Sequence, residues 1–132
     1  MLNPFPIQFL ALFAYTLVRL FLGIVLLNLG ITHVRNRKEV STSFRLPLLP
    51  ESPFAVTLFG LTEILLGTLY ILGFSTQYAA LGTIFMSIFI LFSYRRIASV
   101  HIPQKLSWGF ILITSCSLFI TGAGIFAYDL PL

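Results

Sequence analysis

This sequence contains few charged residues: Asp, Glu, Lys and Arg make up 9% of it, whereas 58% of its 132 residues are hydrophobic. A soluble domain is about one quarter charged, and a chain this apolar cannot cover its surface with polar groups in water. We therefore expect an integral membrane protein. No polar stretch is long enough to fold separately, so residues 1–132 are predicted to form a single all-α transmembrane domain.

Cysteine and histidine are also rare. Cys116 is the only cysteine, which excludes an internal disulfide and a cysteine-based zinc or iron–sulfur site made by this chain alone. The two histidines, His33 and His101, fall at a helix end and in a loop, and we expect interfacial polar residues there and not haem or metal ligands. The sequence also lacks a glycine-rich phosphate loop and a nucleophile elbow. We expect no metal site, no cofactor held by this chain's own ligands and no catalysis by the chain alone.

The excess of positive charge has a specific distribution. Eight Lys and Arg residues against four Asp and Glu give a net charge of +4, which by itself is compatible with nucleic-acid binding. Seven of the eight positive residues, however, fall in two short segments between apolar stretches. This distribution is typical of membrane orientation, and we expect no nucleic-acid partner.

Four apolar stretches are long enough to cross a bilayer as helices, which takes roughly 20 residues each. The predicted spans are about 10–32, 54–73, 78–94 and 106–128. Pro47, Pro50 and Pro53 interrupt the segment between the first two spans, because proline cannot continue a helix interior. The turn at residues 74–77 is so short that the second and third spans must be antiparallel neighbours. The sequence therefore predicts an integral membrane four-helix bundle.

The basic residues predict how this bundle is oriented. Residues 33–53 contain Arg35, Arg37, Lys38 and Arg45, and residues 95–105 contain Arg95, Arg96 and Lys105. The second loop and both tails contain no Lys or Arg. Because positive loops stay on the cytoplasmic side, we expect loops 33–53 and 95–105 to be cytoplasmic and both termini to be non-cytoplasmic.

Two ionisable residues, Arg19 and Glu63, lie well inside the predicted spans. A single charge at mid-bilayer costs about 2.5–3.5 kcal/mol on insertion scales, so such residues are expected to pair or to line a polar cavity. Counted from the outer end of each span at 1.5 Å per residue, Arg19 lies roughly 13 Å and Glu63 roughly 15 Å deep. The sequence therefore predicts an ion pair between Arg19 and Glu63.

Glycines accompany both charges on regular helical spacings. Gly23 and Gly30 share a face of the first span with Arg19, Leu26 and His33. Gly60 and Gly67 share a face of the second span with Glu63 and Tyr70. Small residues on such faces let helices approach closely, so we expect these two glycine faces to pack together.

Two roles for the pair remain open at this stage. It can be a structural bridge that fixes the pairing and register of two helices, which is a better supported use of buried ion pairs than net stabilisation. Alternatively, Glu63 can belong to a proton-transfer or ligand site. Asn28, Tyr70 and Thr62 are the candidates to line such a site.

The stretch RLFLGIVLLNLG (residues 19–30) followed by His33, and the stretch GLTEILLGTLYILGFSTQYAALGTIF (residues 60–85), resemble the DoxX family of small four-helix bacterial membrane proteins. The positions that match the family pattern are Arg19, Gly23, Gly30, Glu63, Gly67, Gly73, Ala79 and Ala80. The resemblance implies a location in the bacterial cytoplasmic (inner) membrane. It also implies a subunit or partner of membrane oxidoreductase systems, including thiosulfate:quinone oxidoreductase, or of oxidative-stress complexes. The sequence departs from what is expected of a redox enzyme, because it lacks a CxxC motif and a recognisable set of cofactor ligands.

Three functions follow from the residues and the resemblance together. The first is a non-catalytic accessory or structural subunit, surrounded by lipid, that associates with a larger membrane protein or with copies of itself. The second is a quinone-linked oxidoreductase subunit with a polar site at Arg19 and Glu63. The third is a small oligomeric transporter that uses Glu63 as a protonatable group, although the third and fourth spans contain no counterpart of Arg19 or Glu63.

Overall fold

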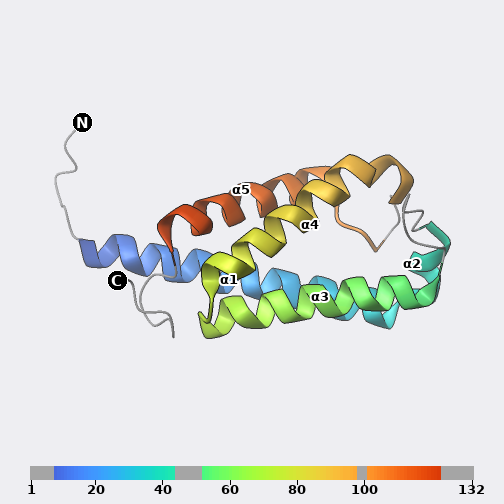
Figure 1. The fold of residues 1–132 in the computed structure, drawn as a ribbon, viewed down its shortest axis with the longest axis horizontal. Coiled ribbons are helices and arrows are strands. Elements are labelled where there is room, and N and C mark those ends of the chain that lie inside the picture. The colour runs from blue at the N-terminus through green and yellow to red at the C-terminus, as the bar shows by residue number, and fades with distance from the viewer. Residues whose placement is uncertain (1–7, 44–51, 98–100, 123–132) are drawn as a thin grey trace.

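In the computed structural model of the chain, residues 8–43, 52–97 and 101–122 are described, and every element in these ranges is a helix (Figure 1). The helices are α1 (Gln8–Arg35), α2 (Arg37–Ser43), α3 (Pro53–Leu72), α4 (Thr76–Ile97) and α5 (Lys105–Thr121). The predicted all-α class is confirmed for the described residues.

Three of these helices are long and apolar enough to cross a membrane. The candidate spans are Leu10–Arg35, Pro53–Leu72 and Thr76–Arg95. They agree with the first three predicted spans to within a few residues at each end. α5 is a shorter apolar helix of 17 residues, and the end of the fourth predicted span, residues 123–128, lies outside the described residues. The chain is thus a helical membrane protein.

The ends of α3 follow from local chemistry. Ser52 precedes the helix, and its hydroxyl accepts a hydrogen bond from the backbone N–H of Phe54 at 3.1 Å. Pro53 occupies the first turn, where its missing N–H costs nothing. At the other end Gly73 adopts a left-handed conformation with φ of 64°, and its N–H donates to the carbonyl of Tyr70. Glycine adopts this conformation without steric cost, so α3 ends there and α4 begins after a short turn.

Helix α2 is a difference from the sequence-based expectation, which placed only a polar loop between the first two spans. Its seven residues include Val40, which is completely buried and clusters with Val56 of α3 and Ile102. A helix this short is marginal in isolation. The burial of Val40 against two distant segments therefore accounts for its formation.

The long helices form two layers (Figure 1). α1 lies against α3, and α4 lies against α5. The side chains between the layers form one hydrophobic core from all four helices, whose largest members include Leu26, Leu66, Tyr70, Ile90, Trp108 and Leu118. The start of α1, in blue, extends well past the turn between α3 and α4.

Glycines bring the backbones of α1 and α3 into direct contact. A Cβ atom added at Gly30 would lie 2.6 Å from the carbonyl oxygen of Gly60, and one added at Gly67 would lie 2.8 Å from that of Gly23. No real side chain tolerates such distances without a shift of the backbone. All four glycines singled out in the sequence thus lie where the two helices meet, and they set an antiparallel register in which Gly23 faces Gly67 and Gly30 faces Gly60.

We expect Gly30→Ala to destabilise the protein, because its added methyl group meets backbone and not a flexible side chain. Overpacking of this kind costs about 1–3 kcal/mol. Gly109→Ala on α5 is the matched control, because nothing lies within 4 Å of the position that its Cβ would take. The melting temperatures of both variants can be measured by thermal unfolding in a mild detergent. Equal melting temperatures for the two variants would contradict the close backbone contact.

Candidate functional site

The most buried pair of ionisable groups in the described residues joins α1 to α3. Nδ1 of His33 lies 2.5 Å from Oε2 of Glu63, and the two side chains are 2% and 0% exposed. The imidazole nitrogen and the carboxyl oxygen are joined by one hydrogen bond. The pair is therefore a short hydrogen bond between two buried ionisable groups, where the low local dielectric strengthens it.

The position of the pair follows from the glycine contact. In a helix each Cα–Cβ bond leans toward the N-terminus, and α1 and α3 run in opposite directions. The His33 side chain therefore leans toward the level of Gly30, and the Glu63 side chain leans toward the level of Gly60. Since these two glycines face each other, the imidazole and the carboxylate meet at the same level, beside the glycine contact.

Part of the hydrogen-bonding capacity of the pair is unused. His33 Nε2 and Glu63 Oε1 are buried and have no hydrogen-bond partner among the described residues. The ring of Phe59 packs beside His33, with 5.8 Å between ring centroids and an interplanar angle of 49°. One nitrogen and one oxygen of the pair thus have no hydrogen-bond partner among the described residues.

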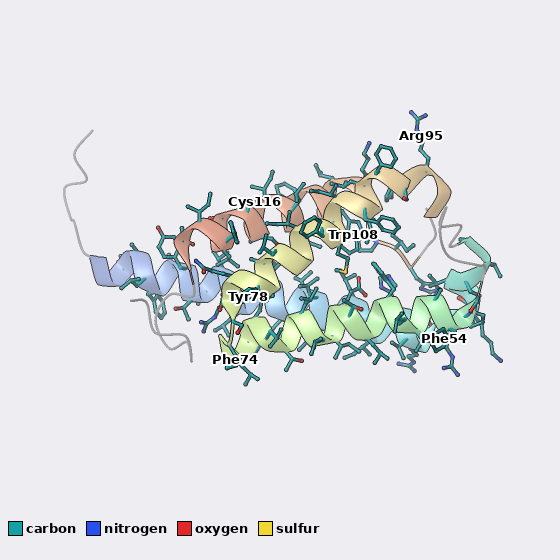
Figure 2. All side chains as sticks on the ribbon, viewed as in Figure 1. Phe54, Phe74, Tyr78, Arg95, Trp108 and Cys116 are labelled. Carbon is teal, nitrogen blue, oxygen red and sulfur yellow. The ribbon has the colours of Figure 1, made fainter. Side chains whose placement is uncertain are left out.

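Other buried polar atoms lie in the same core. Within the described part of the chain, Ser87 Oγ and Trp108 Nε1 are buried and have no hydrogen-bond partner. Tyr70 and Trp108 belong to the core cluster between the two layers, and Trp108 lies on the inner side of α5 (Figure 2). Buried polar groups are normally hydrogen-bonded, so these two atoms, with Nε2 of His33 and Oε1 of Glu63, give each of the four long helices one buried polar atom that is unsatisfied.

Arg19 does not form the predicted pair with Glu63. The carboxylate is paired with His33, and Arg19 is buried on the same face of α1 but nearer to its N-terminal end. In the register set by Gly23 and Gly67, the residue that faces Glu63 is Leu27, about 12 Å further along α1 than Arg19. The depth estimate assumed that both spans begin at one level, whereas α1 extends past the end of α3 (Figure 1).

His33 is the residue whose role the sequence interpretation missed. It was expected at the membrane interface because Arg35 and Arg37 follow it closely, but it is buried in the bundle. Its position on the same helical face as Arg19, Gly23 and Gly30 was the feature that could have identified it.

The three residues expected to line a ligand site separate into two groups. Tyr70 is buried in the core, whereas Asn28 and Thr62 are exposed on the outside of the bundle. Asn28 lies two residues from both Leu26 and Gly30 and so points to the opposite side of α1. The hydroxyl of Thr62 donates to the carbonyl of Leu58 at 2.9 Å, which satisfies it on an apolar surface.

A second polar cluster connects the two basic segments at the α2 end of the molecule. The amide of Asn36 donates to Nδ1 of His101 at 3.4 Å, and Nε2–H of His101 donates to Glu39 Oε2 at 2.7 Å. These groups are partly exposed, so each contact contributes little to stability. Their value is positional, because they show that residues 36–39 and residue 101 lie at the same end of the bundle.

Neither cluster has the composition of a metal centre. In residues 8–43, 52–97 and 101–122 there is no group of three or more His, Cys, Asp or Glu side chains that could hold a metal ion.

A double-mutant cycle tests the pairing. We expect His33→Leu and Glu63→Leu each to destabilise by about 3–5 kcal/mol, because each leaves a buried ionisable group without its partner. The double variant is expected to recover part of that loss. In the control cycle, the changes in unfolding free energy caused by Arg19→Leu and by Glu63→Leu should add to within about 0.5 kcal/mol, as expected for separated sites. The observed pair would be contradicted if Arg19 and Glu63 showed a coupling energy while His33 and Glu63 showed none. Reversible unfolding in detergent is the measurement.

Comparison with known proteins places these features in a family. The model of the DoxX family matches residues 14–96, a segment that contains His33, Glu63 and all four contact glycines. No curated protein and no solved structure shows significant similarity to the chain. Because the family match covers more than half of the sequence, this chain belongs to the DoxX family.

Proposed function

We propose that this chain is a four-span, non-catalytic subunit of the bacterial cytoplasmic membrane that associates with a larger, redox-linked membrane complex. The observation that carries the proposal is the polarity of the bundle. Its ionisable groups Arg19, His33 and Glu63 are buried. Large apolar side chains are exposed along every long helix, among them Phe21, Leu65, Phe85, Phe92 and Ile120. Such a surface is satisfied by lipid chains and by the apolar face of another membrane protein.

The fourth span and the orientation are parts of this proposal. α5 runs from Lys105 to Thr121, and the apolar sequence continues toward residue 128. The contact of His101 with Glu39 brings both basic segments to one end of the bundle, as expected when two crossings, α3 and α4, separate these segments. The positive-inside rule then makes that end cytoplasmic.

Labelling of single cysteines tests the orientation. In a Cys116→Ala background, Thr42→Cys on α2 and Gln77→Cys after the α3–α4 turn both place a thiol at an exposed position. We expect a membrane-impermeant maleimide added to intact cells to label Gln77→Cys and not Thr42→Cys. Inverted vesicles should give the opposite pattern. Labelling of both positions from the same side would contradict the proposed topology.

A specific observation favours a second function, that of a quinone-linked subunit. The unused Nε2 of His33 is a hydrogen-bonding partner for an oxygen of a quinone head. The unused Oε1 of Glu63 is an acceptor for a hydroxyl of the reduced form. Quinone reduction requires protons as well as electrons, and His33 and Glu63 are groups that exchange protons. His33 and Glu63 fit a quinone head, which would supply the redox chemistry. Arg19, which the sequence-based hypothesis placed in the same site, lies at a different height along the bundle from Glu63.

Native purification separates the two functions. From membranes solubilised in a mild detergent, we expect the wild-type chain to elute with a partner in fixed stoichiometry, and mass spectrometry to identify both the partner and the extracted quinones. Glu63→Gln should retain the partner. Loss of a co-purifying quinone in this variant supports the quinone-linked role, because glutamine keeps the size of the side chain but removes the charge. A wild-type protein that purifies alone and without quinone would count against both functions.

A further inference from the structure

The bend between α1 and α2 carries a concentrated positive charge. Arg35, Asn36, Arg37, Lys38 and Glu39 line a hollow of about 340 Å³ at this bend. The side chains of Arg35, Arg37 and Lys38 are exposed. Glu39 is the one acidic residue of the hollow, and one of its carboxylate oxygens is hydrogen-bonded to His101. Three cations thus face the solvent or headgroup region beside one carboxylate that is already engaged.

These cations are held on a fixed support. Val40 of α2 is completely buried against Val56 and Ile102, and Ser41 beside it is buried as well. Because α2 is anchored through its buried face, the basic residues on its other side keep their positions relative to α1 and α3. A preorganised cluster of this kind binds a phosphate more tightly than separate mobile side chains do.

The hollow lies at the depth of lipid headgroups. The apolar span that begins at Leu10 ends at Arg35, so the hollow begins where the hydrocarbon region stops. Below it, α1 exposes Ile31, Ile24 and Leu17 at 54%, 52% and 52%. These three residues are seven positions apart and share one face of the helix, and Arg35 follows Ile31 by one turn. From Ile31 to Leu17 this apolar stripe is about 21 Å long, which exceeds the thickness of one leaflet, about 15 Å.

We propose that the hollow at the α1–α2 bend and the stripe below it together bind one molecule of an anionic glycerophospholipid. The phosphate is bound by Arg35, Arg37 and Lys38, in which each guanidinium can donate two parallel hydrogen bonds to phosphate oxygens. An acyl chain lies along Ile31 and Ile24. The charge of the hollow selects an anionic headgroup, and the stripe selects a lipid over a free phosphate ion. This binding site is independent of the His33–Glu63 pair and of the function proposed for it.

Lipid binding to the purified full-length chain tests the proposal. Phosphatidylglycerol and phosphatidylcholine with identical acyl chains are titrated separately, and native mass spectrometry counts the bound molecules. We expect phosphatidylglycerol to bind at least tenfold more tightly than phosphatidylcholine. Removal of one cation, by Arg35→Gln or Lys38→Gln, should lower the affinity for phosphatidylglycerol about fivefold. The affinity for phosphatidylcholine should change little.

Arg95→Gln is the matched control. Arg95 is an exposed cation of α4 that points away from the helices and belongs to the other layer (Figure 2). We expect this variant to bind phosphatidylglycerol within twofold of the wild type. An equal loss in Arg95→Gln and Lys38→Gln would overturn the proposal, because the attraction would then be a general effect of net charge. Equal affinity of the wild type for both lipids would overturn it as well.

The role of the apolar stripe has its own control. Glycerophosphoglycerol, the headgroup without acyl chains, is expected to compete at least a hundredfold more weakly than the intact lipid. Ile31→Ala should lower the affinity for the intact lipid and leave the affinity for the headgroup alone unchanged. If the headgroup alone competes as well as the lipid, the hollow is a simple anion site and the proposed lipid site is wrong.

Discussion

The contact between the backbones of α1 and α3 is the constraint on which the rest of the structure depends. Where Gly30 faces Gly60 and Gly23 faces Gly67, no side chain separates the two helices. This contact fixes the register, and the register in turn places His33 opposite the carboxylate of Glu63. In a bilayer the hydrophobic effect does not drive helices together, so close packing and one buried hydrogen-bonded pair carry the specificity that a soluble core distributes over many side chains.

The sequence predicted the long helices well because a physical length sets them. Hydrocarbon thickness requires roughly 20 apolar residues, and Pro53 and Gly73 mark the ends of α3 by rules that act within one turn. The glycine faces were also visible, since a helical face depends only on spacing. Helix α2 could not be anticipated in this way, because it forms through the burial of Val40 against Val56 and Ile102, which are distant in the sequence.

The partner of Glu63 was missed for a related reason. Depth counted from the predicted span ends treats two helices as if they started at the same level, but the relative shift of α1 and α3 is decided by which glycines touch. A shift of two turns exchanges Arg19 for His33 as the nearest ionisable group. The register could have been derived by aligning the two glycine pairs first, since their spacings of seven residues match, and only then asking which polar side chains meet.

The interior between the two layers has one more property that follows from its composition. Trp108 is the single tryptophan of the sequence, it is completely buried, and it belongs to the core cluster to which α1, α3 and α4 also contribute. Indole emission moves to longer wavelengths when water reaches the ring. The native chain therefore contains its own optical probe of the layer interface, and separation of the helical layers can be followed in real time without attaching a dye.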